Sequence, residues 1–158
     1  MVKKFIYVII FLMSALIIFS GCENKDANVN DADIPDNINM SLIDRVGKRF
    51  EEIYLAYNEQ RFDDYISYYR IDEDQKNGIL EAVKGGAESY TSRYEIRNVL
   101  AFENEGGDIT ATIVYYTISS IPDGETFIIE ETMYYTLIEE NGNLFISSFE
   151  LGAQTLVE

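Results

Sequence analysis

The residue best suited to do chemistry in this sequence is Glu131, a carboxylate inside a long, largely apolar stretch. In residues 126–139 alternate positions point to opposite faces, and the more apolar face carries Ile129, Met133 and Tyr135 beside Glu131. A carboxylate in apolar surroundings can take a proton from a ligand or hold a positively charged one. The pattern makes Glu131 the candidate base or cation-binding group of a pocket.

Plainer interpretations of Glu131 are favoured over a functional one. Its carboxylate could reach water at the rim of the fold, a β-bulge could turn it outward, or it could pair with Arg93 or Arg97. Tyr115 and Tyr135 lie on neighbouring predicted strands and could line the same pocket with apolar rings and polar hydroxyls. Of the 12 tyrosines, however, most are expected to fill the core and the sheet through cross-strand pairing.

The composition excludes several kinds of site. The chain has no histidine and a single cysteine, so it cannot form a Ser-His-Asp or Cys-His catalytic site or a Cys/His zinc site. The acidic runs at 63–64, 72–74 and 139–140 are typical of solvated helix starts and turns. We therefore expect no metal and no cofactor, and assign no catalytic residue.

The charge of the chain limits its partners. A formal net charge of -16 repels the phosphate backbone of nucleic acids, which argues against nucleic-acid binding. The same charge would be repelled by anionic lipid headgroups. Cations and basic partners would be attracted.

Residues 1–21, with the cysteine that follows them, have the pattern of an export signal. A positive start with two lysines precedes an apolar stretch at residues 5–19, and two small residues stand before Cys22. The stretch is short for a stable transmembrane helix. The sequence F-S-G-C resembles a bacterial lipobox, although Phe19 stands where leucine is usual. The resemblance implies cleavage before Cys22 and a diacylglyceryl anchor on its sulfur, with the protein held at the extracytoplasmic face of the cell membrane.

Two alternatives to a lipid anchor are an uncleaved membrane anchor and an ordinary secretory signal with an incidental cysteine. Residues 22–40 are rich in Asn and Asp and show no sustained apolar period, which is typical of a flexible tether. Asp31 and Asp33 lack the further ligands that a calcium loop needs. We expect a signal peptide at 1–21, a tether at 22–40 and one folded domain at 41–158.

The folded domain changes from a helical period to a strand period along its length. Ser41 to Asp44 resembles a capping box, and Gly85-Gly86 is expected to end the last helix. The expected helices cover residues 41–57, 62–69 and 73–84. The expected strands cover residues 93–102, 109–119, 126–139 and 144–151. In the first strand one side would carry Tyr94, Ile96, Leu100 and Phe102.

The element order predicts an α+β fold, with N-terminal helices packed on a curved four-stranded antiparallel sheet. The corner L-A-Y-N-E-Q-R-F at 55–62, with the helical hairpin that it opens, resembles the nuclear-transport-factor-2-like superfamily of cone-shaped folds, also called SnoaL-like. Gln60-Arg61 replaces the usual Gly-Asp of that corner. A cystatin-like sheet wrapped on one helix is the alternative.

The resemblance implies that the interior of the cone serves as a pocket for catalysis or binding. Isomerases and dehydratases of the superfamily rely on combinations of Asp and His, and this chain has no His. We therefore expect a lipid-anchored extracytoplasmic binding or assembly module, more non-enzymatic than enzymatic, with a protein partner in the cell envelope. The alternative is a pocket enzyme or small-ligand receptor that uses Glu131 with Tyr115, Tyr135 and Met133. An open cavity would favour the alternative, and a filled interior with an exposed aromatic patch outside would favour partner binding.

Overall fold

The computed structural model describes residues 39–122 and 124–157, so the predicted signal peptide and Cys22 lie outside the described residues. This part of the chain forms three helices followed by four strands, as predicted. The helices are α2 (Met40–Asn58), α3 (Phe62–Ser67) and α4 (Glu73–Ser89). The strands are β1 (Thr91–Glu103), β2 (Ile109–Ser120), β3 (Thr126–Glu140) and β4 (Asn143–Val157).

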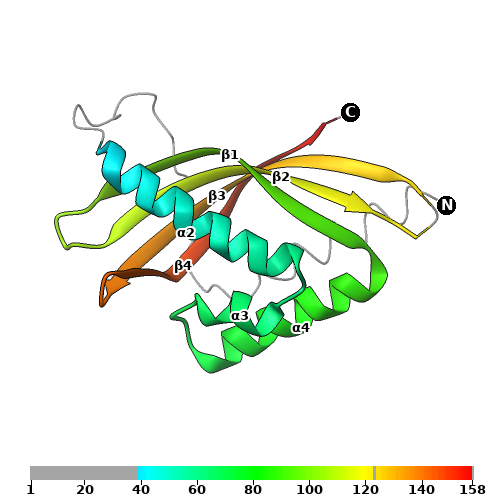
Figure 1. Ribbon diagram of the computed structural model, residues 1–158, viewed down its shortest axis with the longest axis horizontal. Coiled ribbons are helices and arrows are strands. Elements are labelled where there is room, and N and C mark those ends of the chain that lie inside the picture. The colour runs from blue at the N-terminus through cyan, green and yellow to red at the C-terminus, as the bar shows by residue number, and fades with distance from the viewer. Residues whose placement is uncertain (1–38, 123, 158) are drawn as a thin grey trace. The chain divides into compact units, whose positions relative to one another are not determined.

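The four strands form one antiparallel sheet in the order β1-β2-β3-β4. The sheet is strongly curved, α2 crosses its concave face, and α3 lies beside α4 (Figure 1). The face toward α2 is called the inner face here, and the opposite one the outer face. The predicted α+β architecture of helices on a curved four-stranded sheet is confirmed.

Helix α2 supplies most of the helical core. Its buried stripe recurs at three- and four-residue steps and includes Val46, Phe50 and Ile53, each 0% exposed. The cap differs from the prediction: Asn39, and not Ser41, is the N-cap, because its side chain accepts the backbone N–H of Leu42. The N-cap therefore lies two residues before the predicted one, and the first helical residue is Met40.

Helix α4 does not end at Gly85-Gly86 as predicted, but continues to Ser89. Glycines end helices by adopting positive φ, and among the described glycines only Gly107, Gly124 and Gly142 do so. Gly86 has another role, since a Cβ at this position would lie 2.9 Å from the hydroxyl oxygen of Tyr90. The glycine allows the Tyr90 side chain to pack on the helix that precedes it.

Strand β1 contains a β-bulge that the sequence pattern did not reveal. Its register against β2 shifts between Ile96 and Asn98. An extra residue at a bulge exchanges the two faces of a strand. Leu100 and Phe102 were predicted to share a side with Tyr94, but they lie on the outer face, where they are 50% and 45% exposed.

The hairpin between β3 and β4 turns at Asn141-Gly142, as the sequence predicted. Both residues have positive φ, 52° and 78°, which matches the turn that this dipeptide favours. Beyond the turn, β4 extends to Val157, well past the predicted end at Leu151. Near its start, Ile146 forms an isolated parallel bridge with Tyr69, which ties the end of α3 to the sheet edge.

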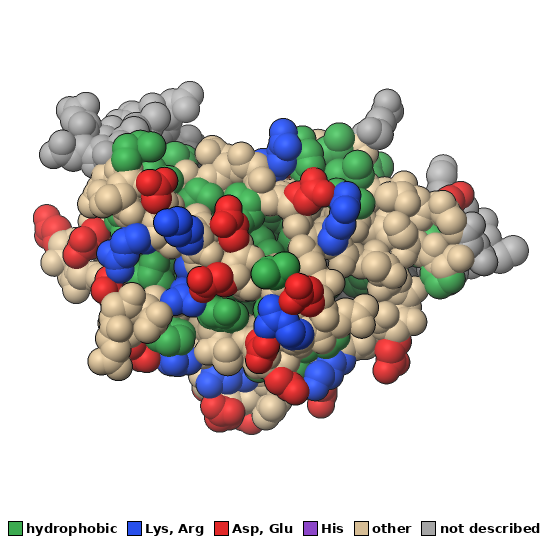
Figure 2. All heavy atoms as spheres, viewed as in Figure 1, with side chains coloured by type: hydrophobic (Ala, Val, Ile, Leu, Met, Phe, Trp, Pro, Cys, Tyr) green, Lys and Arg blue, Asp and Glu red, His purple; other side chains and the backbone are tan. Residues whose placement is uncertain are grey.

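The helical side of the domain has a mixed charge. Acidic and basic side chains are interspersed over the face seen in Figure 2, with no large field of one sign. Several are paired, as Arg45 is with Glu139 at 2.6 Å. Such exposed pairs contribute little to stability, on the order of 0–1 kcal/mol each.

Candidate functional site

The inner face of the sheet changes character along its strands. Beneath α2 it is apolar and fully buried, with Ile109, Ala111, Ile113, Leu137 and Ile146. Toward the other end of the same strands the buried residues are polar: Thr117 and Ser119 are 3% exposed and Glu131 is 1% exposed. The first set is called the apolar end below. The second set, with Ser92 and Gln154, is called the polar end.

The strand register brings Glu131 between two neighbours on the inner face. Tyr115 of β2 lies directly opposite Glu131 on one side, and Gln154 of β4 on the other. The Thr117 hydroxyl donates to Oε2 of Glu131, and the Gln154 amide donates to Oε1. Both carboxylate oxygens are therefore held by neutral donors, which orient the group without neutralising it.

The structure shows none of the three plainer arrangements of Glu131. It is not at a solvated rim, it points inward, and no Lys or Arg of the described residues pairs with it. Arg93 pairs with Glu95 at 2.9 Å, and the Arg97 guanidinium lies 4.7 Å from the centre of the Tyr116 ring. Glu131 is therefore a buried carboxylate that lacks a positive partner in the described part of the chain.

Aromatic rings fill the space between the two ends of the inner face. Tyr115 contacts Tyr54 and Tyr94, with ring centres 5.1 Å and 5.2 Å away. Tyr135 packs on Phe50 at 4.5 Å, and its hydroxyl lies 3.3 Å from that of Tyr54. Further contacts extend the set to Tyr57, Tyr65, Tyr69 and Phe149. The interior is thus largely filled by the protein's own rings, which agrees with the predicted role of tyrosine as core filler.

The buried tyrosines are poor acids. Burial raises the pKa of Tyr57 to about 12 and the pKa of Tyr94 and Tyr115 well above the usual value of 10.0. The negative charge of Glu131 raises the pKa of all three further. Near neutral pH they remain protonated, so they can donate hydrogen bonds but cannot serve as bases.

Two features connect the polar end with the surface. Among the described residues, every fully buried side-chain N or O atom has a hydrogen-bond partner. The Tyr115 hydroxyl has no such partner among them. This hydroxyl therefore reaches accessible space. Gln154 is an exposed residue and half-buried Tyr90 lies close enough for the charge of Glu131 to raise its pKa. Glu131 is thus one side chain away from the solvent on the side of Gln154.

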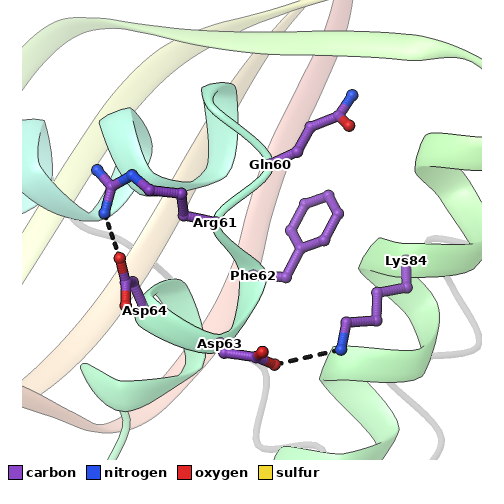
Figure 3. A pocket seen from close by; sticks show the side chains of 6 residues that line it. All are labelled: Gln60, Arg61, Phe62, Asp63, Asp64 and Lys84. Carbon is purple, nitrogen blue, oxygen red and sulfur yellow. Dashed lines mark hydrogen bonds and ion pairs between the residues drawn. The ribbon is translucent and has the colours of Figure 1, made fainter.

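Two surface hollows of the described chain are not lined by Glu131. One, of about 280 Å³, is lined by Gln60, Arg61, Phe62, Asp63, Asp64 and Lys84 (Figure 3). Its charges are internally paired, Arg61 with Asp64 and Lys84 with Asp63. The other, of about 250 Å³, is lined by Glu51, Tyr54, Leu55, Asn58, Tyr94 and Ile96. Neither has an unpaired buried group that would give it chemistry, so the polar end remains the best candidate.

The sequence-predicted pocket residues share one face. Glu131, Tyr115 and Tyr135 are buried on it, and half-buried Met133 lies between them on β3. The prediction missed Thr117 and Gln154, the two donors to Glu131. Thr117 follows Tyr115 by two residues on a predicted strand and could have been found from that spacing. Gln154 lies beyond the predicted end of β4, and no signal in the sequence pointed to it.

The described residues offer no group of three or more Cys, Asp or Glu side chains that could hold a metal ion. None of their helices is long and apolar enough to cross a membrane.

Comparison of the structure with solved structures yields clear similarities at low sequence identity. Aln2 from a Streptomyces species is 11% identical, with a TM-score of 0.59, over 70% of this chain and 89% of that one. A candidate scytalone dehydratase from Novosphingobium aromaticivorans is 8% identical, with a TM-score of 0.60, over 77% of this chain and 91% of that one. The intermembrane space region of the chloroplast protein ARC6 is 12% identical, with a TM-score of 0.51, over 74% of this chain and 98% of that one.

These structures share helices followed by a curved four-stranded antiparallel sheet with the present one. The domain has the nuclear-transport-factor-2-like fold. No protein-family model and no curated protein sequence matches the chain. The likeness therefore concerns the nuclear-transport-factor-2-like fold alone, and function must be argued from the site.

Proposed function

We propose that the polar end of the inner face is a small-molecule site in which Glu131 is a general base. The observation that carries this proposal is a carboxylate that is 1% exposed, bonded by Thr117 and Gln154, and without a positive partner in the described residues. Burying an unpaired charge costs stability. A structural role does not require that cost, whereas a carboxylate base held in a fixed orientation away from water does.

The neighbouring tyrosines fit a proton-transfer reaction of the isomerase or dehydratase type. Glu131 would remove a proton from a carbon next to a carbonyl group. Tyr115, protonated and directly opposite on β2, would donate a hydrogen bond to the oxygen on which negative charge develops. A single carboxylate and a tyrosine can divide these roles, so the reaction needs no histidine. The fold shared with a candidate scytalone dehydratase supports this class of chemistry.

A base-sensitive probe tests the proposal without knowledge of the substrate. The ring of 5-nitrobenzisoxazole opens when a base removes its ring C–H proton: the N–O bond breaks and a coloured cyanophenolate forms. We expect the purified full-length protein to accelerate this reaction, and Glu131→Gln to lose about 100-fold of the rate. Glu130→Gln is the matched control, because this neighbour lies on the outer face of the same strand. Equal rates in the two variants would contradict the role of Glu131.

We also propose that the domain is held at the extracytoplasmic face of the cell membrane by a diacylglyceryl group on Cys22. The supporting observations are the small residues before Cys22, the preceding apolar stretch and the polar tether after it. Two acyl chains give stable attachment where one does not. A Cys22→Ala protein that still fractionates with membranes and incorporates labelled fatty acid would contradict the proposal.

A second candidate function is partner binding through the outer face of the sheet. Leu100, Phe102 and Tyr134 are 40–50% exposed there, which is the kind of exposed patch that marks interaction surfaces. The ARC6 intermembrane space region shows that the fold also occurs outside proteins named as enzymes. If a partner in the cell envelope binds here, Phe102→Ser should abolish its co-purification after crosslinking and leave the base activity of Glu131 unchanged.

A further inference from the structure

The charges around Glu131 point to the chemical class of its ligand. We infer that the site takes a small organic cation, an amine or a quaternary ammonium compound; this inference rests on the proposed small-molecule site. On the inner face of the four strands no position of the described residues holds Lys or Arg. An anionic ligand would therefore meet an uncompensated carboxylate, whereas a cation would supply the missing partner.

Glu131 keeps hydrogen-bonding capacity for such a ligand. A carboxylate can accept about four hydrogen bonds. The described residues supply two donors, Thr117 and Gln154, one on each oxygen. The remaining capacity suits an ammonium N–H group or the polarised methyl groups of a quaternary nitrogen.

The aromatic rings around the carboxylate suit the same ligand. Tyr115 lies opposite Glu131. The centre of its ring is 5.2 Å from that of Tyr94, and the ring centres of Tyr94 and Tyr57 are 4.5 Å apart. The rings meet at steep angles, 86° between Tyr94 and Tyr115 and 52° between Tyr57 and Tyr94, so they do not form a parallel stack. Aromatic walls beside a carboxylate are the usual surroundings of a bound ammonium group.

Arginines of the described residues lie over aromatic rings in other parts of the domain but not over these tyrosines. Elsewhere arginines lie over aromatic rings: Arg70 is 3.6 Å from the ring centre of Phe145, and Arg97 is 4.7 Å from that of Tyr116. The interior tyrosines have a carboxylate beside them but no arginine among the described residues. Among the described residues, the protein's own arginines thus lie over rings at the surface, and none lies over the tyrosines near the polar end.

The inferred route of the ligand to Glu131 runs beside Tyr90. This residue joins α4 to β1 and is half-buried. Helix α4 buries Ile79, whereas Leu80, Val83 and Ala87 are only partly buried against the core. An ion pair of 3.2 Å between Lys84 and Asp63 connects it to α3 (Figure 3). A small displacement of α4 would therefore open the polar end at Tyr90 without disturbing the apolar end.

Choline and its uncharged isostere 3,3-dimethylbutan-1-ol have the same shape but differ in charge. The difference between their affinities therefore measures the contribution of the positive charge to binding. Both are titrated into the full-length protein in dodecyl maltoside, a detergent without charge, and followed by tyrosine fluorescence, which is clean because the chain has no tryptophan. We expect choline to bind at least about tenfold more tightly than the isostere, the size of one charge-assisted contact. Glu131→Gln should remove this difference, and Glu130→Gln should keep it.

The outcomes distinguish the inference from the proposed function. If the isostere binds as tightly as choline, the preference for cations is wrong and the small-molecule site stands. If neither compound binds while 5-nitrobenzisoxazole is still opened in a Glu131-dependent manner, the inference again fails and the proposed base remains. If neither compound binds and Glu131→Gln has no effect on the probe reaction, both proposals fail. A choline preference that survives in Glu131→Gln would place the cation elsewhere and also overturn the inference.

Discussion

The apolar end and the polar end of the inner face are built from the same strands, yet they bury opposite kinds of side chain. At the apolar end, Ile113 and Leu137 are 0% exposed against the stripe of α2. At the polar end, Thr117, Ser119 and Glu131 are buried to nearly the same degree. Equal burial therefore has opposite effects on the stability of the fold at the two ends. Apolar burial stabilises by about 25 cal/mol per Å², whereas burial of an unpaired charge destabilises.

The comparison teaches where to look for function in this fold. A stable domain needs the apolar end, and nothing about stability requires a buried carboxylate without a positive partner. Substitutions at the two ends should accordingly change the free energy of unfolding in opposite directions.

The largest effect is expected at alkaline pH, because the tyrosines between the two ends are buried. Burial raises the pKa of Tyr57 from 10.0 to about 12, so the unfolded chain loses this proton at lower pH than the folded chain does. The stabilisation is complete below pH 10.0 and is lost as pH rises toward about 12. Tyr54, Tyr69, Tyr94 and Tyr115 add to the same loss.

We therefore expect cooperative unfolding in that range, followed by tyrosinate absorbance and far-ultraviolet circular dichroism. Tyr57→Phe should lessen the loss, whereas Tyr116→Phe, on the outer face, should leave it unchanged. Complete tyrosine ionisation with retained secondary structure would show that these rings are not protected by the fold.

The next effect concerns the apolar end. Phe50 is 0% exposed and packs on the rings of Tyr54 and Tyr135. Phe50→Ala should lower the free energy of unfolding by about 3–5 kcal/mol, since it leaves a cavity. Urea denaturation measures the loss. Leu55→Ala is the control on the same helix, because Leu55 is 51% exposed, and it should change stability by less than about 0.5 kcal/mol.

The polar end should respond in the opposite direction. Glu131→Gln removes a buried charge and keeps a side chain that can still bond Thr117 and Gln154. We expect the free energy of unfolding to rise by about 1 kcal/mol while base activity is lost. Urea denaturation of this variant beside Glu130→Gln gives the comparison. Destabilisation by Glu131→Gln would mean that the carboxylate has a structural role after all.

The smallest effect is expected at the ion pair between Lys84 and Asp63. Both side chains are at least half exposed, so their pair should contribute only about 0.5 kcal/mol in a double-mutant cycle and vanish at high salt. The more informative readout is access to Glu131. Lys84→Ala should loosen α4 and speed the reaction with 5-nitrobenzisoxazole, with stability almost unchanged. A slower reaction would contradict entry beside α4.

Much of the architecture could be predicted because it depends on local signals. The period of the apolar residues distinguished α2 from β3, and Asn141-Gly142 marked the hairpin between β3 and β4. Errors arose where local signals compete with packing. Gly85-Gly86 was predicted to end α4, but the helix continues to Ser89, and Gly86 leaves room for the side chain of Tyr90. Leu100 and Phe102 were predicted to share the side of Tyr94, but a bulge turns them to the outer face.

The apolar period of the chain was enough to predict the order of the elements and the strand that carries Glu131, because a strand's period of two is a local property. It left open whether a bulge or the rim of the fold would turn Glu131 outward. Only the tertiary structure decided what surrounds that carboxylate. Its donors Thr117 and Gln154 come from different strands, and the register of β3 with β4 shifts between Glu131 and Met133. Pairing across bulges is set by packing over the whole sheet, so no short stretch of sequence contains it.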